Sequence, residues 1–269
     1  MRRIHPTVEI HPSAEIEEEV EIGPYTVIGP RVYIGRGTRL GSHVVIERNT
    51  RIGKNNLIHH HVVIGSDPQH LAYKGEESWV EIGDGNLIRE FVTIHRGTAL
   101  DRSLTRIGNR CLLMAYVHIA HDCSLGDEVI MANGATLGGH VQVGNRVVFG
   151  GLSAVHQFCR IGSYAFISGM SGVDKDVPPF VKVFGIPAKI QGVNLIGLRR
   201  AGFSKETIRH ISQALGIFLD GPARIQETIE ELRDAFPDDP HVREFIRFIE
   251  NPSRQGIMRR KPFEGEEAF

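Results

Sequence analysis

An aliphatic residue recurs at every sixth position through most of this chain, and this period constrains the fold more than any other feature. One register runs through residues 4–64 and resumes over 82–94, and a second, shifted by one residue, runs through 107–173. A period of six fits neither an α-helix, which repeats every 3.6 residues, nor a single strand, which alternates every two. It is typical of a parallel β-helix, in which each hexad forms one short strand and one corner.

Two residues of each hexad are expected to point inward, the aliphatic residue and the small or β-branched residue four positions later. Glycine often follows the aliphatic residue, where it relieves backbone strain at the corner, and the chain holds 30 glycines in 269 residues. Aromatic residues make up only 7%, as suits a narrow core. Cys111, Cys123 and Cys159 occupy the second inward position, so we expect buried packing thiols without a disulfide.

The hexads predict a mainly β fold in two domains. We expect the β-helix over residues 1–190, with insertions near 66–80 and 98–106, and a C-terminal α-helical domain over 191–269. A helical domain at this place would cap either the end of the repeat stack, which would otherwise expose its core, or an oligomer interface.

The apolar residues take helical spacing after about residue 204. They predict three helices, near 208–218, 225–232 and 242–249, separated by Gly221-Pro222 and by the prolines of 237–240. We expect the tail from Glu264 to Phe269 to be disordered.

Charge and hydropathy exclude several classes of protein. The chain has 31 Lys and Arg residues and 32 Asp and Glu residues, which give a net charge of −1. This charge argues against a protein that binds nucleic acid mainly through an overall positive charge. No run approaches the roughly 20 apolar residues of a membrane span, and the N-terminus lacks a secretory apolar run. We therefore expect a cytoplasmic protein with no nucleic-acid partner and no stable membrane insertion.

Histidines gather on one predicted face of the β-helix. Counting 18 residues per coil stacks the hexads of Ile119, Leu137 and Val155, and each carries a histidine in its outward corner. A neutral imidazole can accept a proton near pH 7, which suits general-base catalysis. The histidines of this cluster are His118, His121, His140 and His156, with His95 beside the second insertion.

His121 is the strongest candidate for the base, because Asp122 follows it and could orient the ring. One coil later, Gly138 and Gly139 leave backbone N–H groups open to a developing oxyanion. Two other interpretations stay open. His118 and His121 could contribute to a zinc site, as in a hydratase, although their spacing of three disfavours it. The chain could also be a non-catalytic solenoid, which would leave the insertions beside the histidines unexplained.

Four segments resemble the bacterial UDP-N-acetylglucosamine O-acyltransferases, which begin lipid A synthesis for lipopolysaccharide. They are 94–98 (IHRGT), 118–123 (HIAHDC), 139–141 (GHV) and 154–158 (AVHQF). The resemblance extends over nearly the whole chain. It implies a left-handed parallel β-helix, a homotrimer with active sites between subunits, and transfer of a 3-hydroxyacyl chain from acyl carrier protein to the sugar 3-hydroxyl.

The resemblance also implies residue roles. His121 would remove the hydroxyl proton, Asp122 would support it, and the Gly139 N–H would stabilise the oxyanion. No covalent intermediate, cofactor or metal would be required. The residues implied to bind substrate are Gln69, His70, His95, His118, His140, His156, Gln157, Gly169, Asn194 and Arg200. Among them, Asn194 and Arg200 would bind the nucleotide end, and Gly169 stands where the family limits acyl length.

The first insertion departs from the family pattern. Members commonly have Gln-Asp-Leu-Lys-Tyr, whereas this chain has His70 in place of the sugar-contacting Asp and Ala72 in place of the Lys. An acceptor with a 3-amino group, giving an amide, is therefore an alternative. A basic cluster in the C-terminal part could dock an acidic acyl carrier protein. Its members are Arg199, Arg200, Lys205, Arg209 and Arg224.

Overall fold

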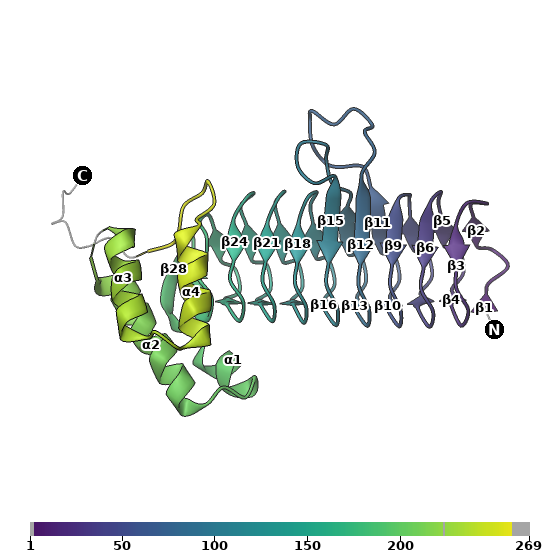
Figure 1. Cartoon of the computed structure of the whole chain (residues 1–269). Coiled ribbons are helices and arrows are strands. Elements are labelled where there is room, and N and C mark those ends of the chain that lie inside the picture. The colour runs from purple at the N-terminus through teal and green to yellow at the C-terminus, as the bar shows by residue number, and fades with distance from the viewer. Residues whose placement is uncertain (1–2, 223, 260–269) are drawn as a thin grey trace.

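The chain folds into a parallel β-helix that is closed at one end by helices (Figure 1). The computed structural model describes residues 3–222 and 224–259, so the expectation for the 264–269 tail lies outside the described residues. Strands of successive coils pair into three sheets that form the three faces of a left-handed prism. Every strand pairing is parallel except the last, between β27 and β28 (Val181–Gly185 and Ala188–Val193).

Sheet A contains eleven strands in spatial order. They are β1 (Arg3–Ile4), β4 (Glu21–Ile22), β7 (Arg39–Leu40), β10 (Leu57–Ile58), β13 (Leu87–Ile88), β16 (Leu112–Leu113), β19 (Ile130–Met131), β22 (Val148–Phe149), β25 (Phe166–Ile167), β27 and β28.

Sheet B contains nine strands. They are β2 (Glu9–Ile10), β5 (Val27–Ile28), β8 (Val45–Ile46), β11 (Val63–Ser66), β14 (Thr93–His95), β17 (His118–Ile119), β20 (Thr136–Leu137), β23 (Ala154–Val155) and β26 (Gly172–Val173).

Sheet C contains eight strands, and each coil passes from sheet A to B to C. They are β3 (Glu15–Ile16), β6 (Val32–Ile34), β9 (Thr50–Ile52), β12 (Trp79–Ile82), β15 (Leu104–Ile107), β18 (Ser124–Leu125), β21 (Gln142–Val143) and β24 (Arg160–Ile161). We call the turns between these faces the A/B, B/C and C/A corners.

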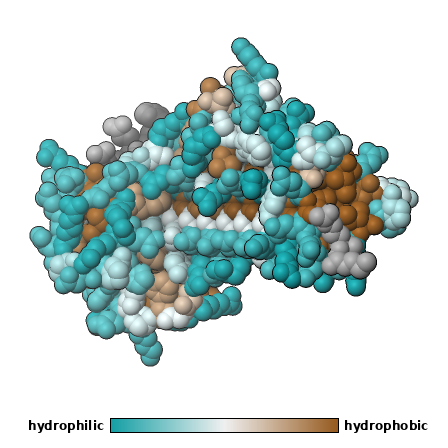
Figure 2. Space-filling view, turned by 45° about the vertical axis from the view of Figure 1, so that its right-hand side comes forward, coloured by the Kyte–Doolittle hydropathy of each residue, from teal (hydrophilic) through white to brown (hydrophobic). Residues whose placement is uncertain are grey.

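The hexad positions pack as the sequence predicts. In the middle coils both inward residues are fully buried, as at Ile58 and Val62, while the strand residue before the aliphatic one faces outward. The first coil lies at the open end of the stack, where Ile4 and Ile10 are each 37% exposed. Figure 2 shows the apolar surface that results at this end.

The cysteines are free and buried in the core, as predicted. Burial raises the pKa of Cys111 to about 11 and the pKa values of Cys123 and Cys159 to about 12. Because the thiolate is the reactive form, we expect no alkylation of the folded protein by iodoacetamide at pH 8 and complete alkylation after unfolding. Intact-mass spectrometry measures the extent of alkylation of the folded and of the unfolded protein. Rapid alkylation of the folded protein would contradict the burial of these thiols.

Both predicted insertions leave the same side of the prism, above β11, β12 and β15 (Figure 1). The first connects Ser66, the end of β11, to Trp79, the start of β12. The second connects His95, the end of β14, to Leu104, the start of β15. They break the hexad register because their residues leave the coil before the next strand begins.

The C-terminal part contains four helices in the described residues, rather than the three predicted. They are α1 (Leu195–Arg200), α2 (Lys205–Asp220), α3 (Ile225–Ala235) and α4 (Pro240–Glu250). Helix α1 was missed because six residues are too few for an apolar period. The division at residue 190 stays a prediction. None of the helices among the described residues is long and apolar enough to cross a membrane.

Candidate active site

The histidines occupy the B/C corner of consecutive coils. His118 in β17 lies opposite Thr136 in β20, which lies opposite Ala154 in β23, so the turns after these strands stack. This register is the one predicted by counting 18 residues per coil. The stacked turns hold His121 and Asp122, then Gly139 and His140, then His156, Gln157 and Phe158.

His121 and Asp122 form a hydrogen-bonded pair inside this corner. His121 Nδ1 donates to Asp122 Oδ2 at 2.9 Å, because an ionised carboxylate can only accept. The proton of the neutral ring therefore sits on Nδ1, and Nε2 carries a lone pair. No protein group in the described residues bonds to Nε2, so this atom can accept a proton from a substrate.

Asp122 is fully buried and is held by residues that sequence reasoning missed. It accepts hydrogen bonds from Thr98 N–H at 2.9 and 3.0 Å and from Thr98 Oγ1 at 2.7 Å, while its own N–H donates to Thr105 Oγ1 at 2.8 Å. Burial by itself raises the pKa of Asp122. The hydrogen bonds from His121 and Thr98 outweigh that effect and hold the pKa below its usual value. Asp122 therefore stays ionised beside His121.

Gly139 lies directly under the ring of His121. A Cβ at this position would stand 2.5 Å from His121 Cε1 and 2.7 Å from Nε2, so only glycine admits the ring. Within the described residues the Gly139 N–H donates no backbone hydrogen bond, whereas the N–H of Gly138 donates to Val155 O at 2.9 Å. A base and a free N–H donor are thus adjacent.

His140 extends the column by one coil. Its ring centroid lies 5.0 Å from that of His121 in an edge-on contact and 4.3 Å from that of Phe158 in a stacked contact. His140 Nδ1 donates to Asp101 Oδ2 at 3.1 Å. Asp101 belongs to the second insertion, so this insertion supports the column at two points, through Asp101 and Thr98.

His95 and His118 form a second edge-on pair, with ring centroids 5.3 Å apart. His95 Nδ1 donates to Asp67 O at 2.6 Å, and His118 Nδ1 shares a hydrogen bond of 2.8 Å with Thr93 Oγ1. Burial, with smaller contributions from His95 and His121, lowers the pKa of His118 from 6.5 to about 4. His118 is therefore neutral at physiological pH.

The His118 pKa predicts a dependence of stability on pH. Between about pH 6.5 and pH 4 the unfolded chain binds a proton at His118 that the folded chain does not, so the free energy of unfolding falls as pH decreases through this window. We expect the variant His118→Gln to show a shallower fall over the same window. Urea unfolding at pH 4, 5, 6 and 7 measures it, and identical slopes for the two proteins would contradict the assignment.

The first insertion brings His70 to the column. Its ring lies edge-on to that of His121, with centroids 5.2 Å apart, and only 6% of His121 is exposed. Gln69, beside it, is exposed. Two segments distant in sequence, near residues 70 and 121, therefore meet at one corner.

The far end of the column is open to solvent. His156 and Gln157 are exposed, and His156 Nδ1 bonds to Gln157 O at 3.2 Å. The C-terminal segment lies against this end, where Gln255 Nε2 donates to Gln157 O at 3.0 Å and the Arg254 guanidinium lies over the Phe158 ring. Sequence reasoning did not place this segment beside the histidines.

Three of the substrate-binding candidates lie at other corners of the same chain. Gly169 follows β25 at the A/B corner. Asn194 lies at the C/A corner, where its Nδ2 donates to Tyr164 O at 2.9 Å and its Oδ1 accepts from Gly197 N–H at 3.1 Å as the cap of α1. Arg200 is exposed at the end of that helix. One chain does not bring these residues to His121.

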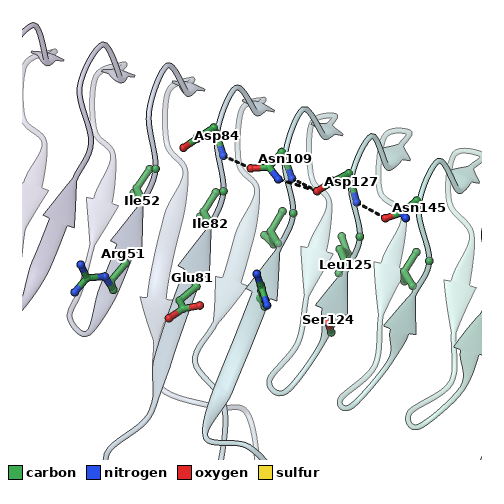
Figure 3. A pocket seen from close by; sticks show the side chains of 18 of the residues that line it. Arg51, Ile52, Glu81, Ile82, Asp84, Asn109, Ser124, Leu125, Asp127 and Asn145 are labelled. Atoms are coloured by element: carbon green, nitrogen blue, oxygen red, sulfur yellow. Dashed lines mark hydrogen bonds between the residues drawn. The ribbon is translucent and has the colours of Figure 1, made fainter.

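A cavity of about 610 Å³ lies on the outer face of sheet C, away from the histidines (Figure 3). A ladder of polar groups along this cavity is hydrogen-bonded from coil to coil. Asp84 N–H donates to Asn109 Oδ1 at 2.8 Å, Asn109 N–H to Asp127 Oδ1 at 2.7 Å, and Asp127 N–H to Asn145 Oδ1 at 2.8 Å. Because the ladder satisfies these groups, it stabilises the stacking of coils and offers no reactive group.

Comparison with known proteins places the chain in a family. A relative from Halorhodospira halophila, an acyl-[acyl-carrier-protein]–UDP-N-acetylglucosamine O-acyltransferase, is 49% identical over 259 residues, which cover 96% of this chain and 100% of the relative. The chain belongs to the UDP-N-acetylglucosamine O-acyltransferase family. A Myxococcus xanthus member is 45% identical over 96% of this chain and 100% of its own length.

The solved UDP-N-acetylglucosamine O-acyltransferase from Moraxella catarrhalis superposes with a TM-score of 0.93 at 46% identity, covering 95% of this chain and 99% of that one. Three family models also match. The second domain of UDP-N-acetylglucosamine O-acyltransferase matches residues 176–258, bacterial hexapeptide transferase repeats match 104–139, and the GMPPB C-terminal domain matches 4–104. The family and fold inferred from the sequence motifs are confirmed.

Proposed function

We propose that this chain transfers a 3-hydroxyacyl group from acyl carrier protein to the 3-hydroxyl of UDP-N-acetylglucosamine, the first step of lipid A synthesis. The observation that carries the proposal is the contact between the His121–Asp122 pair and the Gly139 backbone, which puts a base and an oxyanion donor at one point. The names of the relatives support the substrates.

His121 Nε2 accepts the proton of the sugar 3-hydroxyl as its oxygen attacks the thioester carbonyl carbon. Asp122 stabilises the imidazolium, and the Gly139 N–H donates to the oxyanion that forms. The tetrahedral intermediate then collapses, the C–S bond breaks, and the imidazolium returns the proton to the departing thiolate. The acyl group passes directly between substrates, so the step needs no acyl-enzyme.

Two of the alternatives from the sequence, the 3-amino acceptor and the zinc hydratase, are not favoured. The relatives are O-acyltransferases, which supports an ester product rather than the amide of a 3-amino sugar. His121, Asp122 and His140 offer ligand atoms within 4.8 Å of one another, as a zinc site would need. However, the Asp122 carboxylate is already bonded to Thr98 and to His121, an arrangement that serves proton transfer.

We further propose that the working unit is a homotrimer with its active sites between subunits. Sheet C separates the histidines at the B/C corner from Asn194 and Arg200 at the C/A corner, so the face of a neighbouring copy must bring the second set to the first. The A/B corner carries an exposed stack of rings whose centroids lie 5.0 to 5.1 Å apart, which suits contact between copies around a common axis. Its members are Tyr25, His43, His61, Phe91 and Tyr116.

Two variants test this arrangement. His121→Ala and Arg200→Ala should each be inactive or weak alone, and unfolding and refolding them together should restore activity, because some sites then combine an intact B/C corner with an intact C/A corner. Refolding each variant by itself is the control. If the activity of the co-refolded mixture equals the sum of the activities of the two variants refolded separately, the proposal of a site shared between subunits would be wrong.

The basic cluster is proposed to dock the acyl carrier protein. Arg199, Arg200, Lys205, Arg209 and Arg224 are all exposed on or beside α1, α2 and α3. Because exposed charges act mainly on association, replacing Arg209 and Arg224 by Gln should raise KM for the acyl carrier thioester and weaken its dependence on salt.

The reaction itself is tested by following the free thiol of acyl carrier protein with a chromogenic disulfide. Thiol release should require both the 3-hydroxyacyl thioester and UDP-N-acetylglucosamine. Release without the sugar nucleotide, at an equal rate, would identify a thioesterase instead.

A further inference from the structure

Arg96 is a buried guanidinium that connects the end of β14 to the first insertion. The residue is 1% exposed, and its terminal nitrogens bond to Gly65 O, to the Asp67 carboxylate and to the Tyr73 hydroxyl, the last at 2.9 Å. Its Nε is buried and has no hydrogen-bond partner among the described residues. Both partner side chains belong to the loop 67–73, so Arg96 holds the two ends of that loop together.

The loop between these two ends is a tight turn centred on His70. Tyr73 N–H donates to His70 O at 3.0 Å, and Ala72 N–H donates to His70 Nδ1 at 3.2 Å. Since Nδ1 accepts, the proton of the neutral ring sits on Nε2, which makes Nε2 a donor. The same ring lies edge-on to His121 at 5.2 Å. The loop therefore presents a hydrogen-bond donor beside the proposed base.

Burying a guanidinium with one unpaired N–H is costly, and an apolar residue could fill this space without that cost. Of the three terminal contacts of Arg96, one goes to Gly65 O in β11 and two go to side chains of the loop, Asp67 and Tyr73. Asp67, its charged partner, has a side chain that is 56% exposed. We therefore interpret the role of Arg96 as fixing the conformation of the loop rather than as packing the core.

We propose that Arg96 is a positioning residue, which clamps the loop through Asp67 and Tyr73 so that His70 Nε2–H binds an oxygen of the acceptor sugar next to His121. This inference rests on the proposed function, because the acceptor is the ligand that His70 would bind. The clamp acts through His70 and touches no substrate itself.

The test uses Tyr73→Phe, which removes one clamp hydroxyl and keeps the ring. It should raise KM for UDP-N-acetylglucosamine about five- to tenfold while kcat and KM for the acyl thioester change little. Tyr33→Phe is the matched control, because it likewise removes one hydrogen-bonded hydroxyl and keeps the ring. Tyr33 lies in β6 of sheet C, where its hydroxyl donates to the Glu17 carboxylate, so this variant should leave both KM values unchanged. Thermal unfolding of both variants measures the structural contribution separately.

A double-mutant cycle distinguishes positioning from simple stability. In a His70→Ala background, Tyr73→Phe should have no further effect on KM for the sugar nucleotide, because the group that it positions is gone. Arg96→Lys should keep part of the affinity that Arg96→Gln loses. If Tyr73→Phe lowers Tm but leaves KM unchanged, or if its effect persists in full without His70, the clamp is structural only. A wild-type protein that transfers no acyl group would instead overturn the proposed function.

Discussion

Replacing His121 by alanine should lower kcat for acyl transfer by about 10²- to 10⁴-fold, the range for loss of a general base. The Nε2 lone pair is held in place by the bond from Nδ1 to Asp122, and no second histidine makes such a bond to this carboxylate at hydrogen-bond distance: His140 Nε2 stands 3.8 Å away. KM for both substrates should change much less, because the base acts in the transition state. Steady-state rates at saturating substrate measure the loss.

His210 supplies a matched control for this variant. In helix α2, His210 Nδ1 bonds to Asp239 Oδ2 at 2.8 Å, so the chain contains a second His–Asp pair of the same geometry outside the column. His210→Ala should lose stability and keep kcat. Equal losses of kcat in the two variants would show that stability, rather than proton transfer, explains the effect at His121.

Replacing Gly139 by alanine should be nearly as damaging, with kcat lowered by about 10²- to 10³-fold. The added Cβ would stand 2.5 Å from His121 Cε1, so the ring must move away from the Asp122 carboxylate or the turn must shift. Either movement separates the base from the N–H that would bind the oxyanion. The expected signature is a loss in kcat with both substrates still bound, measured by steady-state kinetics and by direct binding of UDP-N-acetylglucosamine.

Gly216 in α2 is the control glycine, because a Cβ there meets nothing within 4 Å. Gly216→Ala should keep kcat and raise stability slightly, since alanine favours a helix over glycine by up to about 1 kcal/mol. An active Gly139→Ala protein would show that the turn relaxes around the added methyl and that the close contact is unimportant.

The β-helix and the histidine column were predictable because a hexad repeat carries its own register. Once 18 residues form a coil, the position of His121 fixes those of Gly139 and Gln157 without any long-range information. Burial follows by the same rule, which is why the inward cysteines were assigned correctly.

The groups around the column were not predictable in this way. These groups lie in or beside the two insertions, where the hexad register is lost. Their contacts depend on how the non-repeating segments fold back onto the β-helix. The contacts are Thr98 to Asp122, Asp101 to His140, His70 to His121, and Arg96 to the loop 67–73. The motif at 94–98 drew attention to this segment, but its amino-acid sequence does not show that Thr98 forms hydrogen bonds to the Asp122 carboxylate.

The nucleotide-end candidates illustrate a different limit. Asn194 lies at the C/A corner, and its side chain caps α1, a helix too short for its period to be seen. The spacing of residues along one chain can predict the corner at which a residue lies. It does not predict which part of a neighbouring copy of the chain contacts that corner. In the proposed homotrimer, a neighbouring copy would complete the site.

Mass spectrometry of the product tests the proposed function most directly. Purified wild-type protein with UDP-N-acetylglucosamine and 3-hydroxyacyl-acyl carrier protein should give a sugar nucleotide that carries one acyl chain, as an ester on the 3-oxygen by fragmentation. His121→Ala protein should give almost none in the same time. An unmodified sugar nucleotide with free fatty acid, or undiminished product from His121→Ala, would contradict acyl transfer by this histidine.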